Sequence, residues 1–133
     1  MDSWREYLWV GMGGAMGSVL RFWTSGICAR WFGETFPWGT VLVNVSGSFV
    51  IGVLFSIAAP DGRWTIDPLA RQFLMVGVCG GYTTFSSFSL QTLRLMQERQ
   101  WMSAGLNVAA SVAACLLAVW LGFVVGAILN RSR

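Results

Sequence analysis

The sequence predicts an all-α integral membrane protein, with a single domain over residues 1–133 and four transmembrane helices. Apolar residues make up 55% of the chain and charged residues only 11%. A soluble domain of ordinary composition carries about 25% charged residues. The apolar residues gather in long stretches separated by short polar joints. A transmembrane helix needs about 20 such residues, because the hydrocarbon core of a bilayer is about 30 Å thick.

Four segments are long and apolar enough to cross a bilayer. The first, residues 7–29, contains one charged side chain, Arg21; the other three, residues 37–59, 72–93 and 100–130, contain none. We do not interpret the first segment as a cleaved signal peptide, because the apolar core of such a peptide is about 7–15 residues long. The chain therefore reads as one helical membrane domain.

Glycine, proline and charged residues mark the joints at 33–37, 60–68 and 94–100. In the second joint, Asp67 and Pro68 are typical of the cap and the first turn of a helix. These two residues predict that the third helix begins at this point.

The arginines give only a slight preference for one orientation in the membrane. With four spans, both termini and the middle joint share one side, and short loops rich in Lys or Arg normally stay in the cytoplasm. A bias of five against three permits insertion in both directions. The two sets are Arg5, Arg63, Arg71, Arg131 and Arg133 on that side, and Arg30, Arg94 and Arg99 on the other.

The composition argues against several classes of protein. Histidine and lysine are both absent. Histidine is the commonest general base and the commonest metal ligand in proteins. No set of acid, base and nucleophile indicates an enzyme. The arginines form no cluster of the kind that binds nucleic acid. Cys28, Cys79 and Cys115 lie far apart in apolar stretches without a C-x-x-C motif, so we interpret them as small buried side chains.

Small and polar side chains recur every four residues in the second span and in the last, which places each series on one helix face. Two interpretations stay open: close helix packing, in which such residues gather anyway, or a polar track for a solute. Ser48, Gly52 and Ser56 fit either. Asn44 and Asn107 favour the track, because an amide in lipid needs several partners. The series are Thr40, Asn44, Ser48, Gly52 and Ser56, and Ser103, Asn107, Ser111 and Cys115.

The first span combines a glycine-rich face with a charge. Gly13, Gly14, Gly17 and Ser18 form two small-xxx-small pairs, which are typical of helix contacts. Arg21 follows Gly17 by four residues, and no acidic residue lies in any span to neutralise it. Because an unpaired positive charge attracts anions, Arg21 predicts a path for an anion.

The third span is expected to break near Gly80–Thr84. Gly80 and Gly81 are poor helix formers, and Thr83 and Thr84 are β-branched. A broken membrane helix frees backbone carbonyls, and a bound cation is one partner that satisfies them.

Aromatic and hydroxyl side chains follow the expected break. Phe85 and Phe88 are three residues apart and so are neighbours on one face; their ring edges carry partial positive charge that can face an anion. Packing in the core is the alternative for this pair. Ser86, Ser87 and Ser89 add hydroxyl donors.

Together these motifs resemble the Fluc family of fluoride channels, also called CrcB. The resemblance rests on three stretches: GGxxG followed by Arg21, GTxxxNxxGSF from Gly39, and GGYTTFSSFS from Gly80. The third is the most specific. With the chain length and the four spans, the resemblance covers essentially the whole chain.

The resemblance implies a multi-pass channel of the bacterial inner membrane that exports fluoride and so relieves fluoride toxicity. It implies an antiparallel homodimer of oppositely inserted subunits with two fluoride pores. It further implies a structural sodium ion at the dimer centre, held by the backbone carbonyls of Gly80 and Thr83.

The resemblance also implies roles in the pore. The Asn44 amide would donate to fluoride, Phe85 and Phe88 would line the path with their ring edges, and Arg21 would stand in a vestibule. Gln91 stands where the family commonly has an acidic residue, so no role for that charge transfers to this chain. The other expected pore residues are Thr40, Thr84, Ser86 and Ser111.

Two alternatives come from other classes. A small multidrug exporter also uses four spans and dual insertion, but its proton coupling needs a carboxylate within the membrane. All six acidic residues here fall at ends or joints. In a non-transporting assembly protein, the small-residue stripes would only pack helices, and ion flux in liposomes would separate the two cases.

Overall fold

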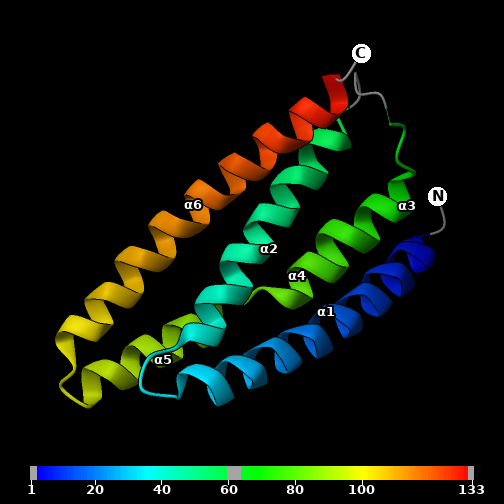
Figure 1. Ribbon diagram of the computed structural model, residues 1–133. Coiled ribbons are helices and arrows are strands. Elements are labelled where there is room, and N and C mark those ends of the chain that lie inside the picture. Colours follow the sequence, from blue (N-terminus) through cyan, green and yellow to red (C-terminus); the bar gives the residue numbers. More distant parts are fainter. Residues whose placement is uncertain (1–2, 60–63, 132–133) are drawn as a thin grey trace.

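The computed structural model describes residues 3–59 and 64–131, and every regular element in these ranges is helical. The all-α prediction is therefore confirmed (Figure 1). In the third helical segment, three short elements follow one another without interruption, and the middle one is a π-helix. The elements are α1 (Ser3–Phe32), α2 (Trp38–Ile57), α3 (Pro68–Arg71), η1 (Gln72–Cys79), α4 (Gly80–Tyr82), α5 (Phe85–Gln97) and α6 (Trp101–Arg131).

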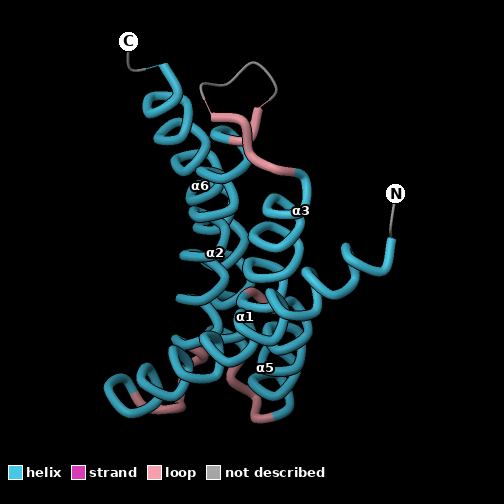
Figure 2. The backbone as a smooth tube through the Cα atoms, turned by 90° about the vertical axis from the view of Figure 1, so that its right-hand side faces the viewer, coloured by secondary structure: helices cyan, strands magenta, loops and turns pink. Residues whose placement is uncertain are grey.

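The helices form a bundle in which α1 and α6 lie on opposite sides (Figure 1). Between them lie α2 and the segment from α3 to α5. The start of α1, the end of α6 and α3 share one end of the bundle, and α5 leads to the other end. Figure 2 shows that α1 is inclined to its neighbours. The most extensive contacts join α2 to α6 and α1 to η1.

Three of the four expected spans meet the length and hydropathy of a membrane-crossing helix: Trp38–Ile57, Pro68–Gln97 and Trp101–Arg131. The fourth, α1, has 30 residues and is long enough. It is less apolar because it contains Arg21 among many small residues. A crossing by α1 therefore stays a prediction.

The outside of the bundle is covered by large apolar side chains. Phe22 is 83% exposed and Met102 78% exposed, and similar residues occur on every long helix. A protein that folds in water rarely exposes so much continuous apolar surface. Exposed tryptophans near helix ends, as at the interfaces of a bilayer, include Trp4, Trp31, Trp38 and Trp101.

The helix ends follow local rules. α1 ends before Gly33, whose φ of +76° lies in the left-handed region that glycine adopts without strain. α3 begins as predicted: the Asp67 carboxylate accepts hydrogen bonds from the N–H groups of Leu69 at 2.8 Å and Ala70 at 3.3 Å. Pro68 occupies the first turn.

Glycines bring α1 directly against the third helical segment, which confirms the contact role predicted for Gly13 and Gly17. Both are buried. A Cβ at Gly17 would overlap the Val78 carbonyl oxygen, and one at Gly13 would lie 3.0 Å from the Gly77 Cα. Side chains at these positions would separate the two helices.

α2 and α6 meet in the same way. A Cβ at Gly52 would overlap the Val119 carbonyl oxygen, and one at Gly122 would overlap that of Phe49. Ser56 lies against Gly126. Of the residues that fitted either packing or a track, Gly52 and Ser56 therefore belong to helix packing.

The predicted break in the third helical segment is confirmed, although the threonines rather than the glycines form it. α4 ends at Tyr82 and α5 begins at Phe85; Thr83 (φ −83°, ψ 160°) and Thr84 (φ −155°, ψ 118°) are extended between them. Gly80 remains helical. Gly81 lies against the Gly14 backbone of α1, so its lack of a side chain serves packing.

Candidate functional site

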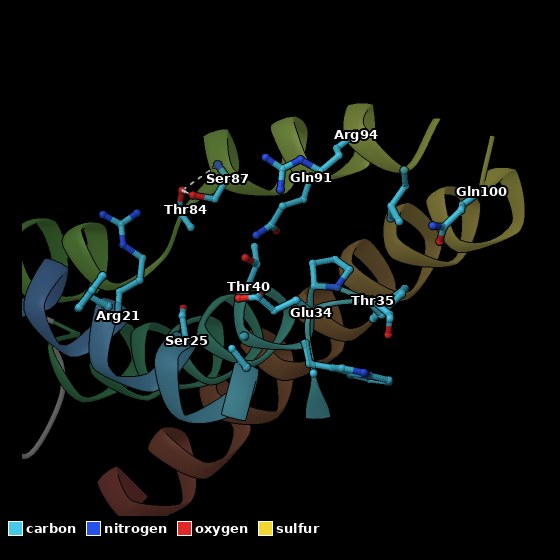
Figure 3. Close-up of a pocket in the computed structure, with 18 of the residues that line it drawn as sticks. Arg21, Ser25, Glu34, Thr35, Thr40, Thr84, Ser87, Gln91, Arg94 and Gln100 are labelled. Carbon is cyan, nitrogen blue, oxygen red and sulfur yellow. Dashed lines mark hydrogen bonds between the residues drawn. The ribbon is translucent and has the colours of Figure 1, made fainter. Parts of the chain in front are cut away.

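Two adjoining cavities lie beside the break. The outer cavity, of about 850 Å³, is lined by α1, α2, α5 and the joint after α1 (Figure 3). The inner cavity, of about 320 Å³, is lined by α2, α5, α6 and the helix before the break. Thr84 lines both and therefore lies between them. The inner cavity includes Asn44, Ser48, Gly80, Thr83, Phe85, Phe88, Ser111 and Cys115; the outer includes Arg21, Ser25, Thr40, Ser87, Gln91 and Arg94.

The cavities bring together nearly all of the expected pore residues. The expected inner pore residues and the two expected cation ligands share the inner cavity. Arg21 and Thr40 line the outer one. Ser86 is the exception: it lines neither cavity, is exposed, and has its hydroxyl 3.2 Å from that of Thr84.

Asn44 holds the backbone of the break. Its Nδ2 donates to the Thr84 carbonyl at 3.0 Å, and the Thr84 N–H donates to its Oδ1 at 2.7 Å. A carboxamide has two N–H donors, and these bonds use one. Asn44 thus fixes the extended conformation of Thr84 and has a second N–H for a ligand in the inner cavity.

The break leaves the backbone carbonyls of residues 80–83 without their helical donors. In a continuous α-helix the N–H of residue 84 would bond to the carbonyl of residue 80, and that of residue 87 to the carbonyl of residue 83. Here the Thr84 N–H bonds to Asn44, and the Ser87 N–H donates to the Thr84 hydroxyl at 3.1 Å, which is the cap of α5. The carbonyls of Gly80 and Thr83 are therefore among the four that the break frees.

The two phenylalanines after the break contact each other, with ring centroids 5.3 Å apart and ring planes tilted by 47°. Their surroundings differ. Phe88 is 8% exposed, whereas Phe85 is 77% exposed. Phe88 therefore forms part of the inner cavity wall within this chain, whereas Phe85 exposes its ring on the surface of the chain.

The outer cavity carries the charges. Arg94, Glu34 and Glu98 come from helix ends and a joint, whereas Arg21 projects from within α1 (Figure 3). Within the described part of the chain, Arg21 forms no ion pair. A half-buried guanidinium without an ion pair attracts anions to its own part of the cavity, whereas the two glutamates and Arg94 lie at helix ends and in the joint.

Asn107 is placed differently from the expected track. It is fully buried between α5 and α6, where its Nδ2 donates to the Thr92 hydroxyl at 2.9 Å. Thr92 donates in turn to the Phe88 carbonyl at 2.8 Å, and the Ser111 hydroxyl donates to Asn107 Oδ1 at 3.3 Å. Asn107 therefore links the helix of Phe88 to the helix of Ser111 and lines neither cavity.

Sequence reasoning named Thr84 and Ser87 but did not recognise that the same face of α5 continues along the outer cavity to Gln91 and Arg94. Thr84, Ser87, Gln91 and Arg94 all line it and follow one another by three or four residues, a helical spacing that was available as a signal. The hydroxyls of Ser46 and Tyr82 also form a hydrogen bond, at 3.1 Å. No local sequence pattern could predict this bond, because the two residues are 36 positions apart.

Fold and site together define a multi-pass α-helical membrane protein with two adjoining cavities and an arginine, Arg21, in the wall of the outer one. Residues 8–123 match the family described as CrcB-like protein, Camphor Resistance (CrcB). The chain belongs to this family, which confirms the resemblance found in the sequence.

Several relatives are named "Fluoride-specific ion channel FluC". The one from Rhodospirillum rubrum is 57% identical over 126 residues, which cover 95% of this chain and 98% of the relative. The one from Opitutus terrae is 54% identical, covering 96% of each chain. The one from Methylocella silvestris is 53% identical, covering 96% of this chain and 98% of the relative.

The family also confirms two broader predictions. The chain is a multi-pass bacterial membrane protein, and it is not an enzyme.

Proposed function

We propose that this protein is a fluoride channel that exports fluoride across the bacterial inner membrane and so relieves fluoride toxicity. The observation that carries the proposal is the pair of cavities on either side of Thr84. They join the Arg21 charge to an inner space lined by uncharged amide, hydroxyl and aromatic groups. The names of the relatives support fluoride as the ion.

The lining suits a small, strongly hydrated anion. Fluoride must exchange its water for other donors as it enters, and the site must not hold it so tightly that exit stops. The second N–H of Asn44, the Ser111 hydroxyl and the ring edge of Phe88 provide donors without a full charge. Arg21 lines the outer cavity and is absent from the lining of the inner one, so it attracts the ion without trapping it deep in the path.

In the functional assembly, α1 is the fourth span and two oppositely inserted chains form a dimer with two pores. The 77% exposure of Phe85 supports a partner on that face, since an exposed ring next to the inner cavity leaves one side of the path open. The slight arginine bias supports insertion in both directions.

A structural sodium ion fits the same place. Sodium is a hard cation that takes oxygen ligands, and the carbonyls of Gly80 and Thr83 are the two that lose their helical donors to Asn44 and Thr84. When bound, sodium would satisfy these dipoles and join the two chains at their helix breaks. Gly80 is exposed, so a second chain can approach it.

Fluoride release from liposomes tests the proposal. Vesicles with the purified protein, loaded with potassium fluoride, should lose fluoride rapidly when valinomycin balances the charge, and vesicles loaded with chloride should lose very little. Protein-free vesicles are the control. Equal passage of the two halides, or no passage of either, would contradict a fluoride-selective channel.

A further inference from the structure

Among the side-chain nitrogen and oxygen atoms of the described residues, one lacks a partner although it is buried: the carbonyl oxygen Oε1 of Gln91. Buried acceptors in native proteins nearly always receive a hydrogen bond, because removing them from water is otherwise unfavourable. The exception stands in the wall of the outer cavity, so an occupant of that cavity can supply the missing donor.

The surroundings of Gln91 restrict what the occupant can be. In Figure 3 the Gln91 side chain reaches from α5 across the cavity toward Thr40 on α2. Thr40 is 5% exposed, and its hydroxyl bonds to no other residue that the structure describes. Arg94 lies three residues after Gln91 on the same face of α5. Where Gln91 faces Thr40, the cavity therefore offers one unpaired acceptor from α5 and one hydroxyl from α2.

An anion does not satisfy this pair, because a carbonyl oxygen repels it. Water does, since it donates two hydrogens, accepts others, and is held in polar sites with two to four partners. We propose that Gln91 and Thr40 hold a water molecule that donates one O–H to Gln91 Oε1 and the other to the arriving fluoride. In this arrangement the Thr40 hydroxyl donates to the water oxygen.

This inference rests on the proposed fluoride channel and gives Gln91 a positioning role in it. Fluoride would pass from bulk water to a fixed water before it meets the protein donors beyond Thr84, so that its hydration is replaced in steps. A glutamate at this position would also offer an acceptor oxygen, and Arg94, three residues on, would offset its charge.

Fluoride efflux from liposomes, measured for four variants, tests the inference. Gln91→Leu removes the acceptor and should slow efflux about tenfold, the factor that corresponds to one hydrogen bond of about 1.4 kcal/mol. Gln91→Glu keeps an acceptor and should retain most of the flux. Thr40→Val should slow efflux as Gln91→Leu does. Gln72→Leu, a half-buried glutamine that lines neither cavity, is the matched control and should leave efflux unchanged.

Thermal unfolding in detergent separates this role from packing. Because Gln91 Oε1 receives no hydrogen bond from another protein group that the structure describes, Gln91→Leu breaks no such bond within the chain. Its unfolding midpoint should therefore equal or exceed that of the wild type while its flux falls. A parallel loss of stability and flux would contradict the inference and indicate packing.

Fluoride efflux of the double variant Gln91→Leu with Thr40→Val is a second test of the inference. If both residues hold one water, the second change costs little once the first is made; independent, multiplicative losses would overturn the inference. A crystal structure adds a direct check, because an ordered water within hydrogen-bond distance of both groups is expected, and fluoride or a protein group bound to Oε1 would contradict it. An inactive wild type would instead refute the channel itself.

Discussion

Phe85 and Phe88 show how two identical residues at one turn of helix can stand in different surroundings. Phe88 is enclosed by its own chain, and the buried network of Asn107, Thr92 and Ser111 supports its helix from behind. Phe85 is exposed. Two phenylalanine rings thus have different positions: Phe88 is part of the inner cavity wall, and Phe85 is accessible from outside the chain.

We predict that Phe88→Ile and Phe85→Ile each slow fluoride efflux about fivefold, which corresponds to about 1 kcal/mol, a typical contribution of one aromatic contact. Isoleucine keeps apolar bulk but lacks a ring edge with partial positive charge. Liposome efflux is the measurement. Unchanged flux in both variants would return these residues to a packing role.

The residue types of the site could be predicted from the sequence, but several of their partners could not. A polar series in the second span and the motif after the break indicated Asn44, Thr84 and Phe88. The hydrogen bonds between Asn44 and Thr84 join residues 40 positions apart, so no local sequence pattern predicts them. Asn107 had the same periodicity as a track residue, yet tertiary packing made it a buried link between helices.

At the scale of elements, glycine has two uses that look alike in sequence. Gly80 and Gly81 were expected to weaken the third helix, but both stay helical and Gly81 admits the α1 backbone. The extended backbone belongs to Thr83 and Thr84 because Asn44 and the α5 cap bind its polar groups. Helix propensity placed the break correctly to within a few residues, whereas hydrogen bonding determined its position.

The π-helix just before the break also lay beyond sequence reasoning. η1 runs from Gln72 to Cys79 along the face that α1 covers. Its residues have ordinary helix propensities and an apolar composition, so nothing local distinguishes a π-helix from an α-helix. Such segments are frequent near functional sites.

We predict that Gly122→Ala destabilises the protein, because the new methyl group would overlap the Phe49 carbonyl oxygen where α2 meets α6. The expected loss in the free energy of unfolding is about 1–3 kcal/mol. Gly105→Ala, on the same helix with nothing within 4 Å, is the matched control. It should raise helix stability by up to about 1 kcal/mol. Thermal unfolding in detergent measures both, and equal midpoints would refute close backbone packing at Gly122.

At the scale of the whole molecule, the single chain leaves residues beside its inner cavity exposed. Long apolar faces of α1 and α6 suit lipid, but Phe85 and Gly80 expose a ring and a backbone carbonyl group beside the inner cavity. Length and hydropathy alone are sufficient to predict three of the spans. α1 is harder to predict because its small residues and Arg21 serve contacts and charge rather than hydrophobicity.

The last prediction concerns assembly. The start of α1 and the end of α6 share one end of the bundle, so accessibility of the termini reports the orientation of each chain (Figure 1). If chains insert both ways, a membrane-impermeant label should reach about half of the tagged termini from either side. Such a dimer brings the third helices together at their breaks, where the freed carbonyls of Gly80 and Thr83 from both chains can converge on one sodium ion.

Sodium is then structural and is not transported with fluoride. Replacing it with a large organic cation should weaken the dimer or stop flux, because four converging carbonyl dipoles would repel one another without a cation between them. A sodium gradient alone should not drive fluoride uphill, because the ion would lie between two separate anion paths. Size-exclusion chromatography and fluoride efflux with and without sodium measure these effects. Sodium-driven uphill transport, or labelling of the termini from one side only, would contradict this arrangement.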